Sequence, residues 1–279
     1  MKPTILSLHP TFNCVNNCAG CYLKREKSKE KKSEKHWSFF AGLIEEAKRL
    51  NFKEVAVAIN EVNEKYNKET NYENNYLELK KRTKDLGMRF TVTTNYQFVQ
   101  RFPEVMIDVN GLDLISISIN EYATRNDEQK NEAIEIIKKL KQANVKVNAN
   151  VLLSENMIKD LLNGWMNKIL EVSDSVYLLL NKLINMKKEQ VLKMFFKLED
   201  FIQNEKVILD SCVRCFNDLT DGICDKYNTV YVNPYGELKL CPYLMNEKRF
   251  TLDSFKDFEK VYNEAIKDVN IPCSNLFQR

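Results

Sequence analysis

Short apolar runs alternate with amphipathic stretches over the first 204 residues. Six runs predict strands: ILSLH (5–9), EVAVAI (54–59), RFTVTT (89–94), DLISISI (113–119), VKVNANVLL (145–153) and SVYLLL (175–180). The stretches between them predict helices at 36–50, 73–86, 96–101, 126–143, 156–171 and 186–204. Strands that alternate with helices imply a parallel sheet with right-handed crossovers. Six units are too few for an eight-fold barrel, so we expect an α/β fold, an open partial (β/α)6 TIM-like barrel over residues 1–204.

The pattern changes after about residue 205, where cysteines become frequent. The segment DKYNTVYVNPYGELKL, between Cys224 and Cys241, predicts a β-hairpin, because Pro234 and Gly236 suit the second and fourth positions of a type I turn. A last helix is predicted at 252–268. We therefore expect a second, smaller, cysteine-rich α+β domain over residues 205–279.

Composition narrows the possible classes of function. Lys and Arg number 42 against 39 Asp and Glu, so no global field favours nucleic acid or an anionic membrane. The chain has no apolar run long enough for a transmembrane helix and no signal peptide, which predicts a cytoplasmic protein. In a reducing compartment, its eight cysteines are more typical of metal or redox ligands than of disulfides. With only two histidines, schemes that centre on imidazole are disfavoured.

The segment KREKSKEKKSEK (24–35) carries seven basic and three acidic residues. A solvated loop or helix start is one interpretation, and a basic lip that attracts an acidic peptide is the other.

Three cysteines follow the first predicted strand with short spacings. Cys14, Cys18 and Cys21 are separated by three and then two residues. Three thiolates on one short loop can bind three of the four irons of a cubane. With no fourth cysteine nearby, one iron stays open for chelation by the amino and carboxylate groups of a methionine moiety. Structural zinc prefers four closed ligands, which no neighbouring cysteine or histidine completes. The motif therefore predicts an iron–sulfur cluster.

The segment LHPTFNCVNNCAGCY and the six βα units together resemble the radical S-adenosylmethionine superfamily, in particular its peptide-modifying members. Thr11 and Asn13 stand in familiar places of that motif. The resemblance implies that a reduced 4Fe-4S cluster on the three cysteines cleaves S-adenosylmethionine to methionine and a 5′-deoxyadenosyl radical, which abstracts hydrogen from a substrate. It also implies an electron donor such as flavodoxin or ferredoxin.

Two segments match the family's cofactor-binding positions after the second and third strands. The family usually has Gly-Gly-Glu after strand two, to hold the methionine ammonium, and this chain has Ile59-Asn60-Glu61. The resemblance assigns the ammonium to Glu61, while both glycines, which allow close backbone approach, are replaced. A solvated loop glutamate is the alternative. After strand three, Thr94 and Asn95 match the family's Thr-Asn-Gly turn, and Tyr96 replaces its glycine.

Further candidates follow strands four and five. Ser118 matches the serine of the family's Ser-x-Asp segment, and Asn120 stands in place of the aspartate. The resemblance implies that they bind the ribose hydroxyls or the methionine carboxylate, with which Arg125 could also pair. On strand five, Asn148 and Asn150 share one face, because side chains repeat every two residues. We expect one of them, Asn150, to face the cofactor, although polar neighbours could satisfy both.

The cysteines after residue 205 resemble the twitch and SPASM auxiliary-cluster domains of the same superfamily, in which a cysteine follows a Gly-containing hairpin. The resemblance implies a second 4Fe-4S cluster, whose expected ligands are Cys215, Cys224, Cys241 and Cys273. One cysteine, Cys212 or Cys215, is then spare, and we take it to be Cys212. The spare cysteine is either inert or a hydrogen-atom donor of the kind that a radical epimerase requires. A zinc knuckle is the alternative, because the Cys212–Cys215 spacing also suits zinc.

The leading hypothesis is an enzyme that cross-links or epimerises a ribosomally made peptide. Because Cys14 lies so near the start, we expect a leader peptide to bind elsewhere or on a partner protein. A dehydrogenase or rearrangement enzyme acting on a small molecule is the runner-up. A non-catalytic iron–sulfur or zinc protein is the alternative of another class.

Overall fold

The fold is that of a computed structural model. The structure describes residues 4–16, 18, 21, 33–103, 112–180, 188–209, 229–240 and 250–267.

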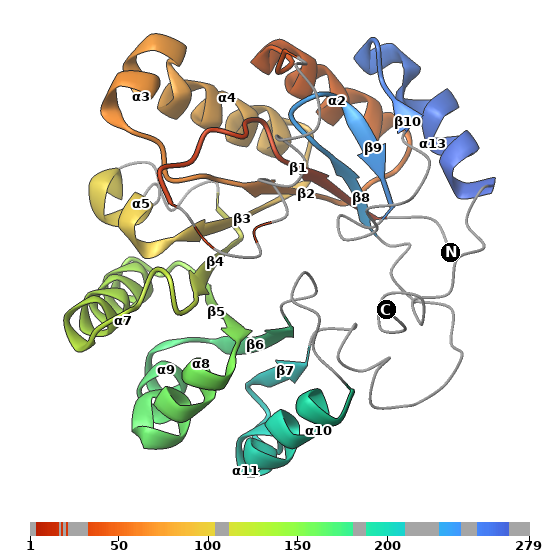
Figure 1. Ribbon diagram of the computed structural model, residues 1–279. Helices are drawn as coiled ribbons and strands as arrows, with labels where there is room; N and C mark the ends of the chain where they lie inside the picture. Colours follow the sequence, from red (N-terminus) through yellow and green to blue (C-terminus); the bar gives the residue numbers. More distant parts are fainter. Residues whose placement is uncertain are drawn as a thin grey trace.

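Within these residues, ten strands form one sheet: β1 (Ile5–Leu8), β2 (Glu54–Ala58), β3 (Arg89–Asn95), β4 (Leu114–Ile119), β5 (Val147–Leu153), β6 (Ser175–Leu180), β7 (Val207–Leu209), β8 (Thr229–Val232), β9 (Glu237–Lys239) and β10 (Phe250–Thr251). Their order is β10-β9-β8-β1-β2-β3-β4-β5-β6-β7, and all neighbouring pairs from β8 to β7 are parallel. Within the described residues, the end strands β10 and β7 do not pair with each other, so the sheet forms an open arc (Figure 1). The predicted partial barrel is confirmed.

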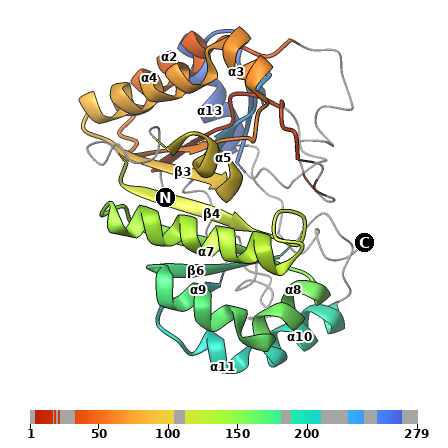
Figure 2. The same cartoon turned by 90° about the vertical axis from the view of Figure 1, so that its left-hand side faces the viewer.

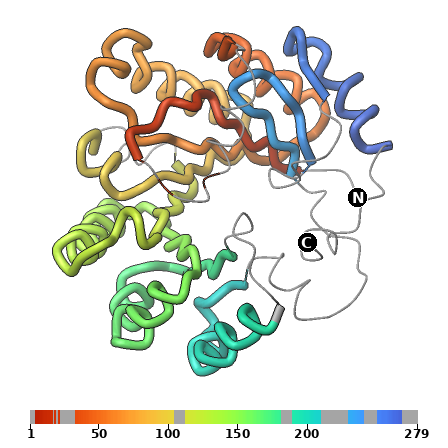
Figure 3. Tube along the Cα trace, viewed as in Figure 1, coloured from red at the N-terminus to blue at the C-terminus, as the bar shows by residue number. Residues whose placement is uncertain are grey.

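Helices cover the convex side of this arc, as the tube and the turned view show (Figures 2 and 3). They are α2 (Trp37–Arg49), α3 (Glu64–Thr70), α4 (Tyr72–Asp85), α5 (Tyr96–Arg101), α7 (Asp127–Gln142), α8 (Glu155–Asp160), the π-helical η1 (Leu161–Trp165), α9 (Met166–Val172), α10 (Lys188–Lys197), α11 (Glu199–Ile202), the 3-10 turn η2 (Phe255–Asp257) and α13 (Phe258–Lys267). No helix within the described ranges has both the length and the apolar character needed to span a bilayer.

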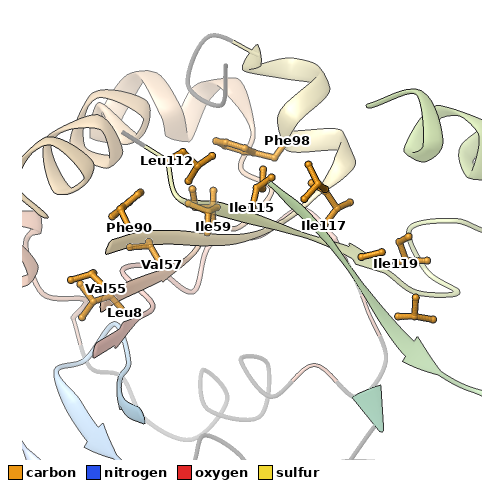
Figure 4. Packing of buried hydrophobic residues seen from close by; sticks show 14 of the residues in the cluster. Leu8, Val55, Val57, Ile59, Phe90, Phe98, Leu112, Ile115, Ile117 and Ile119 are labelled. Carbon is orange, nitrogen blue, oxygen red and sulfur yellow. The ribbon is translucent and has the colours of Figure 1, made fainter. Parts of the chain in front are cut away.

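The strands have one apolar and one more polar face, because their side chains alternate. Val55 and Val57 of β2, and Ile115 and Ile117 of β4, are buried in a core that continues under the helices (Figure 4). The residues between them point to the concave side of the arc. The sequence pattern therefore directs apolar side chains to the helices and polar side chains to the interior, where a ligand can approach the carboxyl ends of the strands.

Helix α7 shows how closely the local sequence signals agree with the structure. The Asn126 side chain caps the helix by accepting from the N–H of Gln129. Acidic residues occupy its first turn and basic residues its last, as the helix dipole favours. Ile134, Ile137 and Leu140 are buried against the sheet, which confirms the amphipathic pattern over 126–143.

The predicted hairpin is formed by β8 and β9, and it extends the barrel sheet. Its turn carries a hydrogen bond from the Gly236 N–H to the Asn233 carbonyl at 2.9 Å, and Gly236 has a φ of 76°. A side chain there would be strained and would lie 3.1 Å from the Leu252 carbonyl, so the glycine is needed. Because β8 pairs with β1, the region after residue 205 shares its sheet with the barrel. The division into two domains at that position stays a prediction.

Candidate functional site

The cysteine motif leaves β1 at the carboxyl edge of the sheet. The Val15 N–H donates to the Glu61 carbonyl at 2.7 Å, which ties the loop to the end of β2. The Asn16 side chain donates to Gln97 of α5 at 3.3 Å. The motif is therefore held over β2 and β3, at the edge where parallel α/β barrels bind their ligands.

The three cysteines of this motif are thiols and take part in no disulfide within the described part of the chain. Cys14 is exposed, and Cys18 and Cys21 are half-buried. Loss of hydration around its sulfur raises the pKa of the Cys14 thiol, although the residue as a whole is exposed. Among the described residues, no three His, Cys, Asp or Glu side chains converge as the ligands of one metal ion would. A cubane requires no such convergence, because each thiolate binds a different iron, so three thiols on one loop are a suitable donor set.

An aromatic pair supports the end of the motif. Phe12 and Tyr235 are 4% and 7% exposed, with ring centroids 4.6 Å apart. Cys21 packs against this pair. Tyr235 belongs to the turn of the β8–β9 hairpin, so that turn contacts the first cysteine motif directly.

A polar cluster closes the base of the cysteine loop. The Glu34 carboxylate accepts a hydrogen bond from the Thr11 hydroxyl at 2.8 Å and another from the Phe12 N–H at 2.7 Å. The Tyr66 hydroxyl of α3 lies 2.8 Å from the Thr11 hydroxyl. The Lys35 N–H donates to the Pro234 carbonyl at 2.7 Å. Thr11 and Phe12, which precede the cysteine motif, are thus bonded to Glu34, which follows it. Lys35 is bonded to the turn of the hairpin.

The residues that replace the two glycines after β2 have structural roles. Ile59 is buried in the core (Figure 4). The Asn60 amide donates to the Thr11 carbonyl at 2.7 Å, and its oxygen lies 3.0 Å from Nε2 of His9. Because the amide oxygen can only accept, His9 carries its proton on Nε2. Burial lowers the pKa of His9 to about 4, so the ring is neutral. This Asn60 clamp, defined by Asn60, His9 and Thr11, joins the ends of β1 and β2.

Glu61 is almost completely buried, at 1% exposure, which argues against a solvated loop glutamate. Its carboxylate forms an ion pair with Arg101 at the end of α5, but neither oxygen accepts a hydrogen bond of ordinary geometry within the described part of the chain. Arg101 also donates to the Val62 carbonyl at 2.7 Å. Burial raises the pKa of Glu61, and the Arg101 charge opposes that shift.

A cavity of about 360 Å³ opens beside this ion pair. It is lined by Val15, Asn16, Glu61, Gln97, Gln100 and Arg101. Neither Ile59 nor Asn60 lines it, so the two replacements do not narrow it. A second cavity, of about 210 Å³, shares Val15 with the first and includes Cys14 and Tyr66 in its lining. Val15 of the cysteine motif thus lines both cavities, and of these two only the larger contains a buried carboxylate.

Three predicted residues form a row across the sheet. Asn95 of β3 pairs in register with Ser118 of β4, which pairs with Asn150 of β5. All three are half-buried. The Asn95 side chain also caps α5 by accepting from the Phe98 N–H at 2.8 Å. The structure thus brings together three polar side chains that lie far apart in the sequence.

Asn148 lies on the same side of β5, as predicted, but differs from Asn150 in burial. Asn148 is buried, and its side-chain oxygen accepts from the Ser175 hydroxyl. A polar neighbour therefore satisfies Asn148, whereas Asn150 is more accessible.

Two other predicted residues are engaged in the turn after β4. The Asn120 oxygen accepts from the N–H groups of Tyr122 at 3.0 Å and Ala123 at 3.1 Å. Arg125 is exposed, and its Nε donates to the Tyr122 carbonyl at 2.9 Å. Neither residue lines the two cavities. A role for them in cofactor binding remains a prediction.

Sequence reasoning missed Arg101, Glu34 and Tyr235, whose contacts with Glu61, Thr11 and Phe12 join residues that are distant in sequence. A single arginine at the end of a helix does not by itself predict a binding site. Its position after the third strand, however, is consistent with the carboxyl edge of the sheet, where ligands are expected. The predicted auxiliary ligands Cys215, Cys224, Cys241 and Cys273, and the spare Cys212, lie outside the described residues.

No family model and no curated protein matches the chain. Several solved structures do match it in fold. Streptococcus suis SuiB bound to precursor peptide SuiA superposes with a TM-score of 0.67 and 14% identity, over 96% of this chain and 67% of SuiB. SuiB bound to S-adenosylmethionine gives 0.65 and 15%, over 100% and 66%. Histidine-tagged anSMEcpe with bound AdoMet gives 0.62 and 13%, over 99% and 84%. The chain spans about two thirds of the length of SuiB. Its fold is the partial barrel of SuiB and anSMEcpe.

Proposed function

We propose that this chain is a radical S-adenosylmethionine enzyme that modifies a peptide. One observation carries the proposal: three thiols stand at the carboxyl edge of a parallel sheet, beside a cavity that contains a buried carboxylate and an arginine. Three thiolates supply cluster ligands, and the carboxylate suits an ammonium group. The likeness in fold to SuiB and anSMEcpe supports the same assignment.

The residues divide into two groups by the ligand that they would hold. Cys14, Cys18 and Cys21 would hold a 4Fe-4S cluster, with Glu61 at the methionine ammonium. The row of Asn95, Ser118 and Asn150 would contact the remaining polar groups of S-adenosylmethionine. When bound and reduced by an external donor such as flavodoxin or ferredoxin, the cluster supplies the electron for cleavage of S-adenosylmethionine into methionine and a hydrogen-abstracting 5′-deoxyadenosyl radical. The chain itself binds and orients these groups and limits the access of water.

A peptide is the favoured substrate because the structures that this fold resembles include peptide complexes. SuiB was solved with precursor peptide SuiA, and native anSMEcpe with AdoMet and the Cp18Cys peptide. The outcome that we propose is a cross-link or an epimerisation. A second cluster held by Cys215, Cys224, Cys241 and Cys273 would accept an electron or anchor the substrate.

Anaerobic reconstitution with iron and sulfide tests the cofactor assignment. We expect about eight irons per chain, since each cubane contains four, and 5′-deoxyadenosine that forms only with reductant. Replacement of Cys14, Cys18 and Cys21 by Ala should leave about four irons and no nucleoside. Cys212→Ala is the matched control and should keep the full iron content. Bound zinc, with no nucleoside from the wild type, would contradict the proposal.

The substrate class needs a separate experiment. Short peptides encoded beside the gene are incubated with the reduced enzyme and analysed by mass spectrometry. Loss of a pair of hydrogen atoms indicates a cross-link, whereas deuterium uptake from heavy water indicates epimerisation. A small alcohol or sugar that is consumed with 5′-deoxyadenosine, while every such peptide stays unchanged, would instead support a small-molecule enzyme.

A further inference from the structure

We propose that the inner face of β5, β6 and β7 is a specificity site for the peptide substrate and takes one large apolar or aromatic side chain. This inference rests on the proposed function and deepens it, because it states which type of residue the peptide carries beside the cofactor. The site consists of Leu152, Tyr177, Leu179 and Ile208, and we call these four residues the inner patch.

The inner patch lies on the concave side of the arc. Tyr177 and Leu179 of β6 alternate with residues that are buried in the core under the helices, so they point away from the helices. Ile208 of β7 pairs in register with Tyr177, and Leu152 of β5 pairs with Leu179. The inner patch therefore spans three neighbouring strands at one end of the arc (Figure 1).

The inner face changes its chemistry between β5 and β6. On β3, β4 and β5 it carries polar side chains, among them Thr93, Ser118 and Asn150. The residues of the inner patch are instead aliphatic or aromatic and half-buried, and none of them belongs to a hydrophobic cluster of the described residues. Packing of the helices does not need this apolar surface, so it is available to a ligand.

The inner patch directly continues the row of polar residues that would contact S-adenosylmethionine. Tyr177 pairs in register with Asn150, which pairs with Ser118. Neighbouring strands lie about 5 Å apart, so a side chain on the inner patch would lie only one strand beyond the cofactor row. That position is the one that a substrate requires, because the hydrogen atom to be abstracted must come close to the cofactor.

The spacing of the strands gives the inner patch the size of one large side chain. Three strands cover about 10 Å across the sheet, and side chains on one face repeat about every 7 Å along a strand. An aromatic ring or a branched aliphatic group fills such an area. The Tyr177 hydroxyl forms no hydrogen bond with another described residue, so it can donate to a peptide carbonyl beside that group.

The test measures which peptides the protein retains when S-adenosylmethionine is present and reductant is absent. Reconstituted protein is mixed with short glycine–serine peptides that are identical except for the central residue, which takes every amino acid in turn. Retained peptides are identified by affinity-selection mass spectrometry. We expect the wild type to retain peptides with a central Phe, Trp or Leu about tenfold more than those with Ser or Asp, as burial of one large side chain implies.

Variants of the inner patch should change this preference in a defined direction. Leu179→Glu introduces a carboxylate, so peptides with a central Lys or Arg should be retained about tenfold more than by the wild type. Phe196→Glu, at an exposed aromatic residue of α10, is the matched control and should keep the wild-type preference. Tyr177→Ala should lose most of the preference for aromatic residues. Tyr177→Phe keeps the ring and should retain that preference, with weaker retention of all peptides.

A wild type without a preference for large apolar residues would overturn the inference. A preference that stays the same in Leu179→Glu and Tyr177→Ala would also overturn it, because the peptide would then bind elsewhere. Iron content and melting temperature establish that each variant is folded, and the two Tyr177 variants decide if Leu179→Glu is not. Either failure leaves the proposed function intact while the wild type forms 5′-deoxyadenosine with reductant. A wild type that forms no nucleoside contradicts the proposed function itself.

Discussion

Phe12 packs against Tyr235 and thereby joins the cysteine loop to the turn of the β8–β9 hairpin. The ring centroids are 4.6 Å apart, and both side chains are buried. Cys21 contacts this pair, so a residue from the last third of the chain supports a thiol of the first motif. The turn of the hairpin is consequently part of the first candidate site.

Loss of the Tyr235 ring should weaken the cysteine loop. In Tyr235→Ala, we expect a loss of about 1 kcal/mol from the ring pair in addition to the lost buried area. The reconstituted protein should release iron faster on exposure to a chelator. Chelation kinetics and thermal unfolding measure the two effects. Tyr235→Phe keeps the ring and should behave like wild type in chelation. Unchanged chelation kinetics in Tyr235→Ala would show that the ring does not support the motif.

Asn60 should matter for stability, because its side chain joins β1 to β2. Asn60→Ala removes the side chain that the His9 ring and the Thr11 carbonyl contact, at a cost of about 1–3 kcal/mol for each buried group. The same applies to Asn60→Gly, although it restores the residue typical of the resembled family. Asn131→Ala, on the exposed face of α7, is the control and should be nearly neutral. Chemical denaturation measures the differences. A neutral Asn60→Gly would contradict the structural role.

The neutral His9 ring should make unfolding pH-dependent. Its pKa is lowered by burial from 6.5 to about 4, so the unfolded state takes up a proton first as the pH falls. The unfolding free energy is therefore unaffected by His9 above pH 6.5 and decreases below it, by about 2 kcal/mol at pH 5. His9→Gln removes this contribution. We expect the gap in stability between wild type and variant to narrow by that amount between about pH 8 and pH 5. A gap that stays constant would show that the pKa of His9 is the same in the folded and unfolded states.

Asn148 and Asn150 should separate stability from cofactor binding. Asn148 is buried and bonded to Ser175, so Asn148→Ala should destabilise the fold by about 1–3 kcal/mol. Asn150 is half-buried in the row with Ser118, so Asn150→Ala should leave the melting temperature nearly unchanged and weaken S-adenosylmethionine binding. Each variant is the control for the other. Unfolding and equilibrium binding are measured on both, and an equal effect of the two substitutions on binding would contradict the assignment.

The strands, and the shared face of Asn148 and Asn150, could be predicted because each depends on a local rule. Alternation in VKVNANVLL places Asn148 and Asn150 on one face whatever they contact. Helix α3 was missed because its sequence, EKYNKET, has no buried residue and so no apolar periodicity. Strand β7 was missed because three residues are too few for a pattern.

The site itself depends on contacts that no local rule contains. Arg101, at the end of the helix after β3, forms an ion pair with Glu61, which follows β2. Glu34 accepts a hydrogen bond from Thr11, although the whole cysteine motif lies between them in the sequence. Matching positions to a family motif pointed to Glu61, but it gave no sign that Arg101 is its ion-pair partner, since side-chain pairing depends on how helices lie on the sheet. The sequence therefore indicated individual candidate residues, but not the side chains with which they pair.

The hydrogen bonds of Glu34 to Thr11 and Phe12 have a consequence for how this region can change in length. They bring the two ends of the intervening segment together at one point of the barrel, so Cys14 is held from the base of a closed loop. Closing a longer loop costs little more, about 0.6 kcal/mol for each doubling of its length. Extra residues inserted between the anchors at Thr11 and Glu34 would therefore add little to the free energy of loop closure. Such an insertion would lengthen the chain between the two anchors while the anchors themselves keep their positions.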